Sequence, residues 1–142
     1  LLMQAVIPKM KEKNFGRIIN ITSAMVKNPH LIMGLSTSAR SSLHGLSKAL
    51  SREVAQYNIT INNVLPERID TDRQTQILNF QAKLADSTYE EAKKELEETL
   101  TAKRMGTVEE FSGICTFLCS EQAAYISGQN ISVDGGNSTN LI

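Results

Sequence analysis

The sequence predicts an α/β fold with a parallel sheet, for three reasons. Residues 17–22 (RIINIT) and 58–65 (NITINNVL) are short β-branched runs, and the first is apolar on both faces, as strands inside a parallel sheet are. Residues 35–56, between them, repeat apolar side chains every three or four positions, which is typical of an amphipathic helix. Strand, long helix and strand make a βαβ unit, whose strands are parallel and whose connection is right-handed.

The composition is that of one globular domain, and it argues against two classes of partner. The 142 residues are 41% hydrophobic and 21% charged, which is enough for a modest core. The 15 basic and 15 acidic residues cancel, so no net charge attracts nucleic acid or an anionic membrane. The apolar runs are too short to span a bilayer, and no secretory leader is visible. We therefore expect a cytoplasmic protein that binds neither nucleic acid nor membrane.

The chain opens inside a helix rather than before one. Residues 1–14 have a helical pattern that should stop at 14–16, where asparagine and glycine favour a C-terminal cap. The face expected to pack is formed by Leu2, Ala5, Val6 and Met10. Because the first residue is Leu1 and lies within an element, we expect residues 1–142 to be one partial domain, a fragment of a longer protein.

The long helix at 35–56 is expected to face the sheet with its apolar stripe. A loop over residues 23–34, marked by Pro29 and Gly34, precedes it, and Pro66 closes the strand that follows it. The members of the stripe are Leu35, Ala39, Leu43, Leu46, Leu50 and Val54.

The rest of the chain alternates helices with a final strand. Residues 70–85 form a helix, and a capping box at Ser87 and Glu90 opens the next one. A second capping box, Thr107 with Glu110, opens a helix that runs to Cys119, and residues 129–137 (QNISVDGGN) hold the last strand and a glycine turn. The apolar face of that helix is predicted to contain Phe111, Ile114, Cys115, Leu118 and Cys119, with no metal site at the cysteines.

Four motifs in this order resemble the C-terminal half of a short-chain dehydrogenase/reductase. They are GRIINITS at 16–23, SARSSLHGLSKAL at 38–50, ITINNVLP at 59–66 with IDT at 69–71, and ISGQNISVDGG at 126–136. The resemblance implies half of a Rossmann-like doubly wound parallel sheet, about three strands with flanking helices. It also implies hydride transfer between NAD or NADP and a small-molecule carbonyl or alcohol, and a homodimer or homotetramer.

The resemblance also assigns catalytic positions, and two of them hold unusual residues. Ser23 matches the catalytic serine, whereas Ser36 stands at the tyrosine position and Arg40 at the lysine position. A serine hydroxyl is a far weaker acid than a phenol whose pKa a lysine lowers. Arg40 keeps its proton at any working pH, so it cannot relay one. The two side chains are four residues apart and share a helix face. The geometry of the family's pair is therefore kept, but the tyrosine that would act as the acid is absent.

Cofactor contacts follow from the same resemblance. Arg40 would hydrogen-bond the ribose, while Pro66, the backbone near Ile69 and the hydroxyl of Thr71 would meet the nicotinamide carboxamide, beyond the carboxyl ends of the strands. Glu67 replaces a family glycine that allows close backbone approach. The family's asparagine and Gly-rich phosphate loop would lie upstream of Leu1, so we expect the fragment alone to be inactive and to bind dinucleotides poorly.

Two histidines are alternative acids. His30, in the loop after Ser23, borders the substrate pocket of the family, whereas His44 is expected to face solvent or a neighbouring subunit.

The sequence leaves three hypotheses open. The first is an oxidoreductase with an atypical active site; the second is a pseudoenzyme of the same fold, acting as a cofactor-binding scaffold or interaction protein. The third is a free-standing interaction module, which the start at Leu1 disfavours. Cofactor binding without turnover separates the second from the first.

Overall fold

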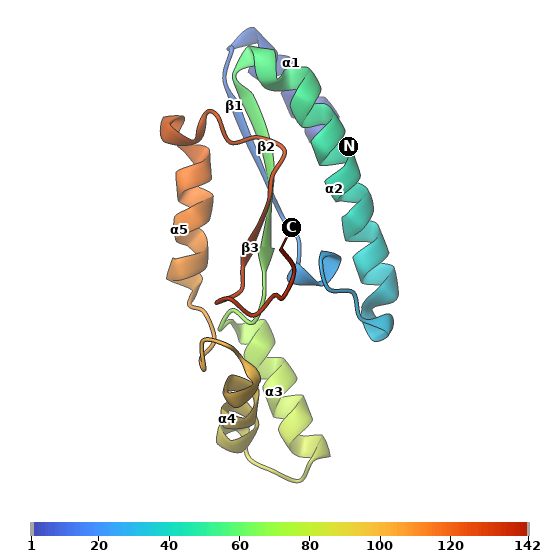
Figure 1. The fold of residues 1–142 in the computed structure, drawn as a ribbon, viewed down its shortest axis with the longest axis vertical. Helices are drawn as coiled ribbons and strands as arrows, with labels where there is room; N and C mark the ends of the chain where they lie inside the picture. Colours follow the sequence, from blue (N-terminus) through green and yellow to red (C-terminus); the bar gives the residue numbers. More distant parts are fainter. Residues whose placement is uncertain (1, 142) are drawn as a thin grey trace.

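A computed structural model describes residues 2–141 and has the predicted α/β architecture (Figure 1). Each predicted helix and strand is present, with ends that differ by one or two residues. The helices and strands are α1 (Leu2–Glu12), β1 (Gly16–Ile21), α2 (Gly34–Val54), β2 (Ile59–Pro66), α3 (Asp72–Leu84), α4 (Tyr89–Thr99), α5 (Val108–Cys119) and β3 (Asn130–Val133). Short 3-10 turns lie at η1 (Ala24–Val26), η2 (Leu31–Met33), η3 (Ala55–Tyr57) and η4 (Glu121–Ala123).

The three strands form one parallel sheet in the order β1-β2-β3. This arrangement confirms the βαβ prediction, with α2 as the crossover between β1 and β2. Asn20, Asn63 and Asn130 lie opposite one another in the register. Their side chains form a hydrogen-bonded row across the sheet, from Asn63 Nδ2 to Asn130 Oδ1 at 2.7 Å and from Asn20 Nδ2 to Asn63 Oδ1 at 2.9 Å. The row satisfies polar groups that burial would otherwise penalise.

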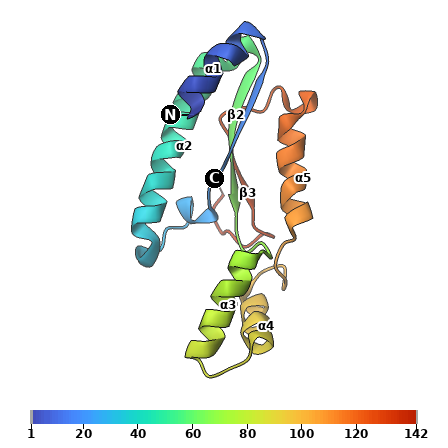
Figure 2. The same cartoon turned by 180° about the vertical axis from the view of Figure 1, so that it is seen from behind.

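Helices cover both faces of the sheet. Helices α1 and α2 lie on one side and α5 on the other, and the pair α3 and α4 extends past the carboxyl ends of the strands (Figures 1 and 2). The core is accordingly divided into three groups of buried side chains. One centres on Val54, Ile59 and Ile61, one on Val64, Leu118 and Ala123, and one between α3 and α4 on Leu78 and Leu100.

The predicted apolar stripe of α2 is only partly the face that packs. Leu35 is 93% exposed and Leu46 44% exposed, whereas Val54 is buried as predicted. The other buried positions of α2 are polar: Thr37, His44, Ser47 and Ser51. Small serine side chains let the helix approach neighbouring backbone closely, since a Cβ at Gly128 would lie 2.5 Å from Ser51 Oγ.

The serine hydroxyls on this face have partners of their own. Ser47 Oγ donates to the Leu43 carbonyl at 2.7 Å and accepts from Asn20 Nδ2 at 3.0 Å, while Ser51 Oγ donates to the Lys48 carbonyl at 2.9 Å. The hydroxyls of Ser47 and Ser51 are therefore satisfied although they are buried, which explains why hydrophobic periodicity misjudged the face.

Three further predictions about faces and caps need correction. In α1 the packed residues are Met3, Ile7 and Met10, while Leu2 is 86% exposed, because this helix carries two overlapping apolar rows and the sequence does not decide between them. The cap of α4 is Thr88 with Glu91, one residue later than predicted. The predicted pair, Ser87 with Glu90, has the same three-residue spacing, so the motif alone does not distinguish the two. In α5 Cys115 packs against the core as predicted, but Cys119, which falls on the last turn, is exposed.

The capping box of α5 confirms the prediction at Thr107 and Glu110, and it gives a stability test. Thr107 Oγ1 accepts from Glu110 N at 3.1 Å, and Glu110 Oε2 accepts from Thr107 N at 2.8 Å. We expect Thr107→Ala to lower the free energy of unfolding by about 1 kcal/mol, measured by urea denaturation. Thr116→Ala, at an exposed threonine within the same helix, should change it much less. Equal losses in the two variants would refute the capping role.

None of the helices between residues 2 and 141 combines the length and apolarity that crossing a bilayer requires.

Candidate functional site

Ser23 lies two residues after the end of β1, at the edge of the sheet where the carboxyl ends of the strands meet. Ligands of open α/β sheets bind beyond this edge. Ser23 has an extended backbone and caps η1, its Oγ accepting from Met25 N at 3.3 Å. The hydroxyl hydrogen is not needed for that contact, so it is free to donate to a ligand.

Ser23 lines a pocket of about 220 Å³, here called the Ser23 pocket. The pocket lies between the loop after β1, the turn after β2 and the start of α3. It brings together two of the predicted site residues, Ser23 and Pro66, and also includes His30, one of the two alternative acids. The remaining walls are formed by Ala24, Met25, Asn28, Glu67, Arg68, Gln74 and Ile77.

The predicted cofactor-binding residues after β2 share a second, open depression of about 340 Å³. Pro66, Ile69 and Thr71 all line it, and Pro66 also belongs to the Ser23 pocket, so the two hollows adjoin. The other lining residues are Ile21, Arg68, Val108 and Phe111, which make most of this surface apolar.

Backbone geometry at Ile69 fits a primary amide such as that of nicotinamide. Ile69 forms a parallel bridge with Gly106, in which Gly106 N donates to Arg68 O at 3.0 Å and Asp70 N donates to Gly106 O at 2.8 Å. In such a bridge the N–H and C=O of Ile69 itself point the other way and stay available. Thr71 Oγ1 accepts from Gln74 N at 3.4 Å, so its hydroxyl hydrogen also stays available.

Ser36 and Arg40 form hydrogen bonds with each other and do not line either of these hollows. The Arg40 guanidinium donates to the Ser36 hydroxyl and, at 3.2 Å, to the Ser36 carbonyl, and both residues are half-buried in the first turns of α2. Neither lines the Ser23 pocket or the depression. The predicted pairing on one helix face is thus present, but the structure does not bring Arg40 together with Pro66, Ile69 and Thr71.

His44 is buried, which corrects the expectation that it faces solvent or a neighbouring subunit. Only 8% of it is exposed, and its Nε2 lies 2.8 Å from the hydroxyl of Thr22, the residue before Ser23. The error arose because a histidine in a helix with leucine neighbours has no sequence signal for burial, whereas here it lies on the polar face against β1. Burial, and secondarily the positive charge of Lys27, lowers the pKa of His44.

This lowered pKa predicts acid sensitivity. Below the ordinary histidine pKa of about 6.5 the unfolded chain binds a proton that the folded chain resists, so the free energy of unfolding should fall as the pH decreases through that range. Urea denaturation at about pH 7.5 and about pH 5.5 measures the difference. His44→Gln, which keeps a partner for Thr22, should remove much of it, and His30→Gln at an exposed position should not. An unchanged slope in His44→Gln would contradict the assignment.

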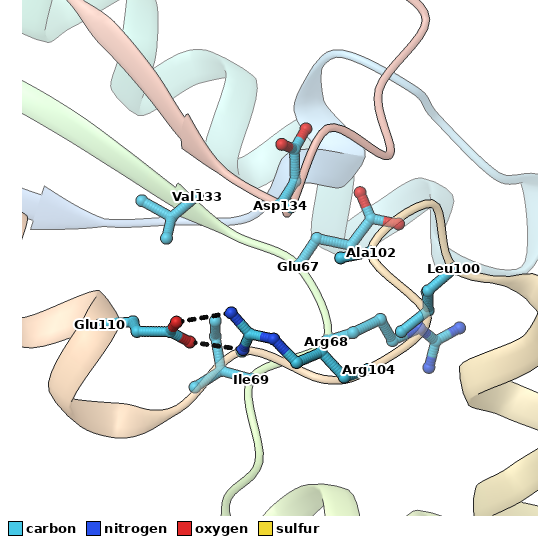
Figure 3. A pocket seen from close by; sticks show the side chains of 11 residues that line it. Glu67, Arg68, Ile69, Leu100, Ala102, Arg104, Glu110, Val133 and Asp134 are labelled. Atoms are coloured by element: carbon cyan, nitrogen blue, oxygen red, sulfur yellow. Dashed lines mark hydrogen bonds and ion pairs between the residues drawn. The ribbon is translucent and has the colours of Figure 1, made fainter.

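A third cavity, of about 240 Å³, lies on the other side of the turn after β2, toward β3 and α5 (Figure 3). Its main polar feature is the bidentate pair of Arg104 with Glu110, at 2.6 and 2.8 Å. The pair, with the Thr107 N–H, lowers the pKa of Glu110 to about 2. Figure 3 shows the Arg68 side chain directed away from this pair. Of the predicted site residues only Ile69 reaches this cavity.

Sequence reasoning missed two residues of the Ser23 pocket, Arg68 and Gln74. Arg68 lies in the segment between Pro66 and Thr71, at a position where the family's motif specifies no residue type, so nothing in the sequence indicated a role for it. Gln74 gave one that could have been used, since it continues the buried row of α3 with Leu78 and Ala82 at four-residue spacing. A polar residue in such a row needs a partner or a role.

The comparisons with known proteins agree with this geometry. Residues 1–138 match the family model described as Enoyl-(Acyl carrier protein) reductase. The NADPH-dependent reductase BacG of Bacillus subtilis is 38% identical over 128 residues, which cover 90% of this chain and 49% of BacG. Dehydrogenase/reductase SDR family member 4 of Sus scrofa is 34% identical over 142 residues, covering 99% of this chain and 47% of that protein.

Solved structures superpose closely on the chain. YwfH, described as an NADPH-dependent reductase involved in bacilysin biosynthesis, has a TM-score of 0.90 at 34% identity and covers 98% of this chain and 53% of its own. The L-sorbose reductase of Gluconobacter frateurii, solved with NADPH and L-sorbose, has a TM-score of 0.90 at 27% identity, with 99% and 54% covered. The chain spans about half the length of the relatives it matches.

Proposed function

Because the chain belongs to the short-chain dehydrogenase/reductase family, we propose that the protein containing it transfers hydride between NAD(P)(H) and a small carbonyl or alcohol substrate. NADPH is the form named for BacG, for YwfH and for the sorbose reductase complex, so we propose NADPH as the cofactor to test first. The chain would supply the substrate side of the site, and an upstream half would supply the Gly-rich phosphate loop.

The observation that carries this proposal is the adjacency of two hollows, which share Pro66 and Arg68. One holds the free hydroxyl of Ser23, and the other is lined by Pro66, Ile69 and Thr71. The Ile69 backbone and the Thr71 hydroxyl would hold the amide of a nicotinamide ring, beside a pocket that accepts a substrate. Bound NADPH supplies the hydride.

Ser23 would act on the substrate oxygen. Its hydroxyl is oriented by η1 and donates a hydrogen bond to the carbonyl, which strengthens as negative charge develops there. A serine is too weak an acid to give up its proton, so the alkoxide must be protonated by another group. His30, exposed and on the wall of the same pocket, would pass a proton from solvent, a role for which imidazole is suited near neutral pH.

Ser36 and Arg40 have a different role in this proposal. Their hydrogen bonds to each other would fix the first turns of α2, with Arg40 placing positive charge near the cofactor ribose in the complete site. Consumption of NADPH and NADH by the purified full-length protein that contains this chain, across a panel of aldehydes and ketones, tests the function. Turnover of any member supports it, and no consumption across the whole panel would refute it.

The mutual contact of Ser36 and Arg40 also favours a second candidate. With no phenol at this position, the protein would be a pseudoenzyme that binds cofactor as a scaffold without turnover. Saturable NADPH binding, measured by the fluorescence of the dihydronicotinamide ring, together with no turnover would support this candidate over the first.

Exposed apolar side chains support a proposed homodimer or homotetramer. Leu31 and Ile32 are each 97% exposed and Leu35 is 93% exposed, which forms an apolar cluster at the start of α2. We also propose that the protein works in the cytoplasm on small-molecule substrates.

A further inference from the structure

The Ser23 pocket contains a buried amide without a partner. Gln74 is 7% exposed, and its side-chain nitrogen Nε2 makes no hydrogen bond within residues 2–141. Gln74 lines the pocket from the first turn of α3, where its backbone N–H is already used by Thr71. An unpaired buried amide costs free energy, so its hydrogens are a site for an acceptor that a ligand brings.

Arg68 adds a cation to the same pocket. Within residues 2–141 the ion pairs are Lys11–Glu53 and Arg104–Glu110, so the guanidinium of Arg68 has no acidic partner. The residue is exposed and lines the pocket together with Ser23 and Gln74, at a turn that also borders the depression and the third cavity. A guanidinium without a partner presents a planar set of donors that matches a carboxylate.

The backbone of Arg68 is held in an unfavourable conformation. Its φ of +52 lies in the left-handed region, which costs a residue other than glycine about 1 kcal/mol or more. Gly106 holds the turn from both sides, donating to Arg68 O and accepting from Asp70 N. A Cβ on Gly106 would lie 2.9 Å from Ile69 Cδ1, so a larger residue there would require the Ile69 side chain to shift. The turn that presents Arg68 is therefore fixed by the fold.

The carboxylate on the pocket wall makes no ion pair with Arg68 within residues 2–141. Glu67 is the only carboxylate there among residues 2–141, and its Oε1 accepts from Asn137 Nδ2 at 2.8 Å. His30 is the remaining titratable side chain on the wall. At about 220 Å³ the pocket is smaller than the roughly 300–1,000 Å³ typical of sites for drug-sized ligands.

From these observations we propose that the Ser23 pocket recognises small carbonyl compounds that carry a carboxylate, with Arg68 and Gln74 binding the carboxylate and Ser23 facing the carbonyl. The inference rests on the proposed function in taking this pocket as the substrate site. Arg68 would form the charge-assisted, two-pronged contact, and Gln74 Nε2 would donate the third hydrogen bond from the buried side. Specificity would follow because a neutral analogue leaves both donors unpaired.

The test is a calorimetric titration of the protein without reduced cofactor, so that binding is read apart from reduction. The probes are pyruvate and levulinate, each paired with its neutral methyl ester, and inorganic phosphate. We expect at least one acid to bind about tenfold or more tightly than its ester, the effect of a hydrogen-bonded charge. Equal affinity for acids and esters, or no binding of either acid, would overturn the proposal, as would phosphate binding as tightly as the better acid.

Variants locate the contact. Arg68→Met should remove the preference for the acid and Gln74→Met should reduce it severalfold, whereas Arg68→Lys, which keeps the charge, should retain part of it. Arg73→Met is the matched control. Arg73 is an exposed arginine at the start of α3, the helix that contains Gln74, and it lines neither the Ser23 pocket nor the depression. A preference that survives Arg68→Met, or that falls equally in Arg73→Met, would overturn the proposal.

The two proposals fail separately. A protein that binds levulinate through Arg68 but never consumes NADPH refutes only hydride transfer. A protein that reduces levulinate and its methyl ester with equal kcat/KM refutes only the carboxylate site.

Discussion

Ser23→Ala is expected to lower kcat/KM for carbonyl reduction by about a hundredfold, the loss typical of removing one hydrogen bond to a developing oxyanion. Ser23 is the polar group that the fold places at the end of β1, and its hydroxyl hydrogen is not needed by the turn it caps. The measurement is steady-state NADPH consumption with the best carbonyl substrate of the panel. Alanine keeps the backbone free to form η1, so circular dichroism should be unchanged.

Ser36→Ala is the matched control for that result, because it removes the same hydroxyl thirteen residues later on α2. The Ser36 hydroxyl accepts a hydrogen bond from Arg40 and lies outside the Ser23 pocket, so we expect kcat/KM to change by only a few-fold. If Ser36→Ala abolished turnover and Ser23→Ala did not, the catalytic roles would be reversed and the proposed position of the substrate would be wrong.

Leu118→Ala is expected to lower the free energy of unfolding by about 2–5 kcal/mol, the largest effect on stability that we predict. Leu118 is fully buried and packs with Val64 and Ala123 where α5 meets the sheet. Truncation removes its apolar burial and leaves a cavity that the strands and the helix cannot close. Urea denaturation of the purified protein measures the loss.

Phe117→Ala is the control for Leu118→Ala, since it deletes a larger side chain one position earlier. Phe117 is 42% exposed, so its loss should cost clearly less despite its size. A larger loss at Phe117 would mean that α5 packs through a different face, for example against a partner.

The sequence predicted correctly those parts of the fold that depend on strand propensity, βαβ connectivity and helix capping. β-branched runs, a long crossover helix and the Thr107–Glu110 box correctly predicted the strands, their parallel order and the start of α5. Hydrophobic periodicity failed where the core is polar. The face of α2 is set by Ser47 and Ser51, whose hydroxyls bond within the helix, and by the asparagine row on the sheet. Periodicity counts such residues as solvent-facing, although here they are buried.

The residues of the site could be predicted only from the resemblance to the family and from their positions at the carboxyl ends of strands. Ser23 and Pro66 follow strands, so the fold brings them to one pocket, and the short segment after β2 brings Ile69 and Thr71 near Pro66. Arg68 could not be predicted in the same way, because its role depends on a left-handed turn held by Gly106, which is far along the chain. His44 was misplaced for a similar reason, since its partner Thr22 lies on a different element.

The most direct test of the central claim is to follow the hydride itself. The protein is incubated with a carbonyl substrate and NADPH that carries deuterium at nicotinamide C4, prepared separately for each face of the ring, and the alcohol is analysed by mass spectrometry. We predict one deuterium on the former carbonyl carbon, transferred from one face of the nicotinamide ring only. Alcohol that lacks the label with both cofactor preparations, or cofactor binding with no alcohol formed, would contradict hydride transfer at this site, and the second result would establish a cofactor-binding scaffold instead.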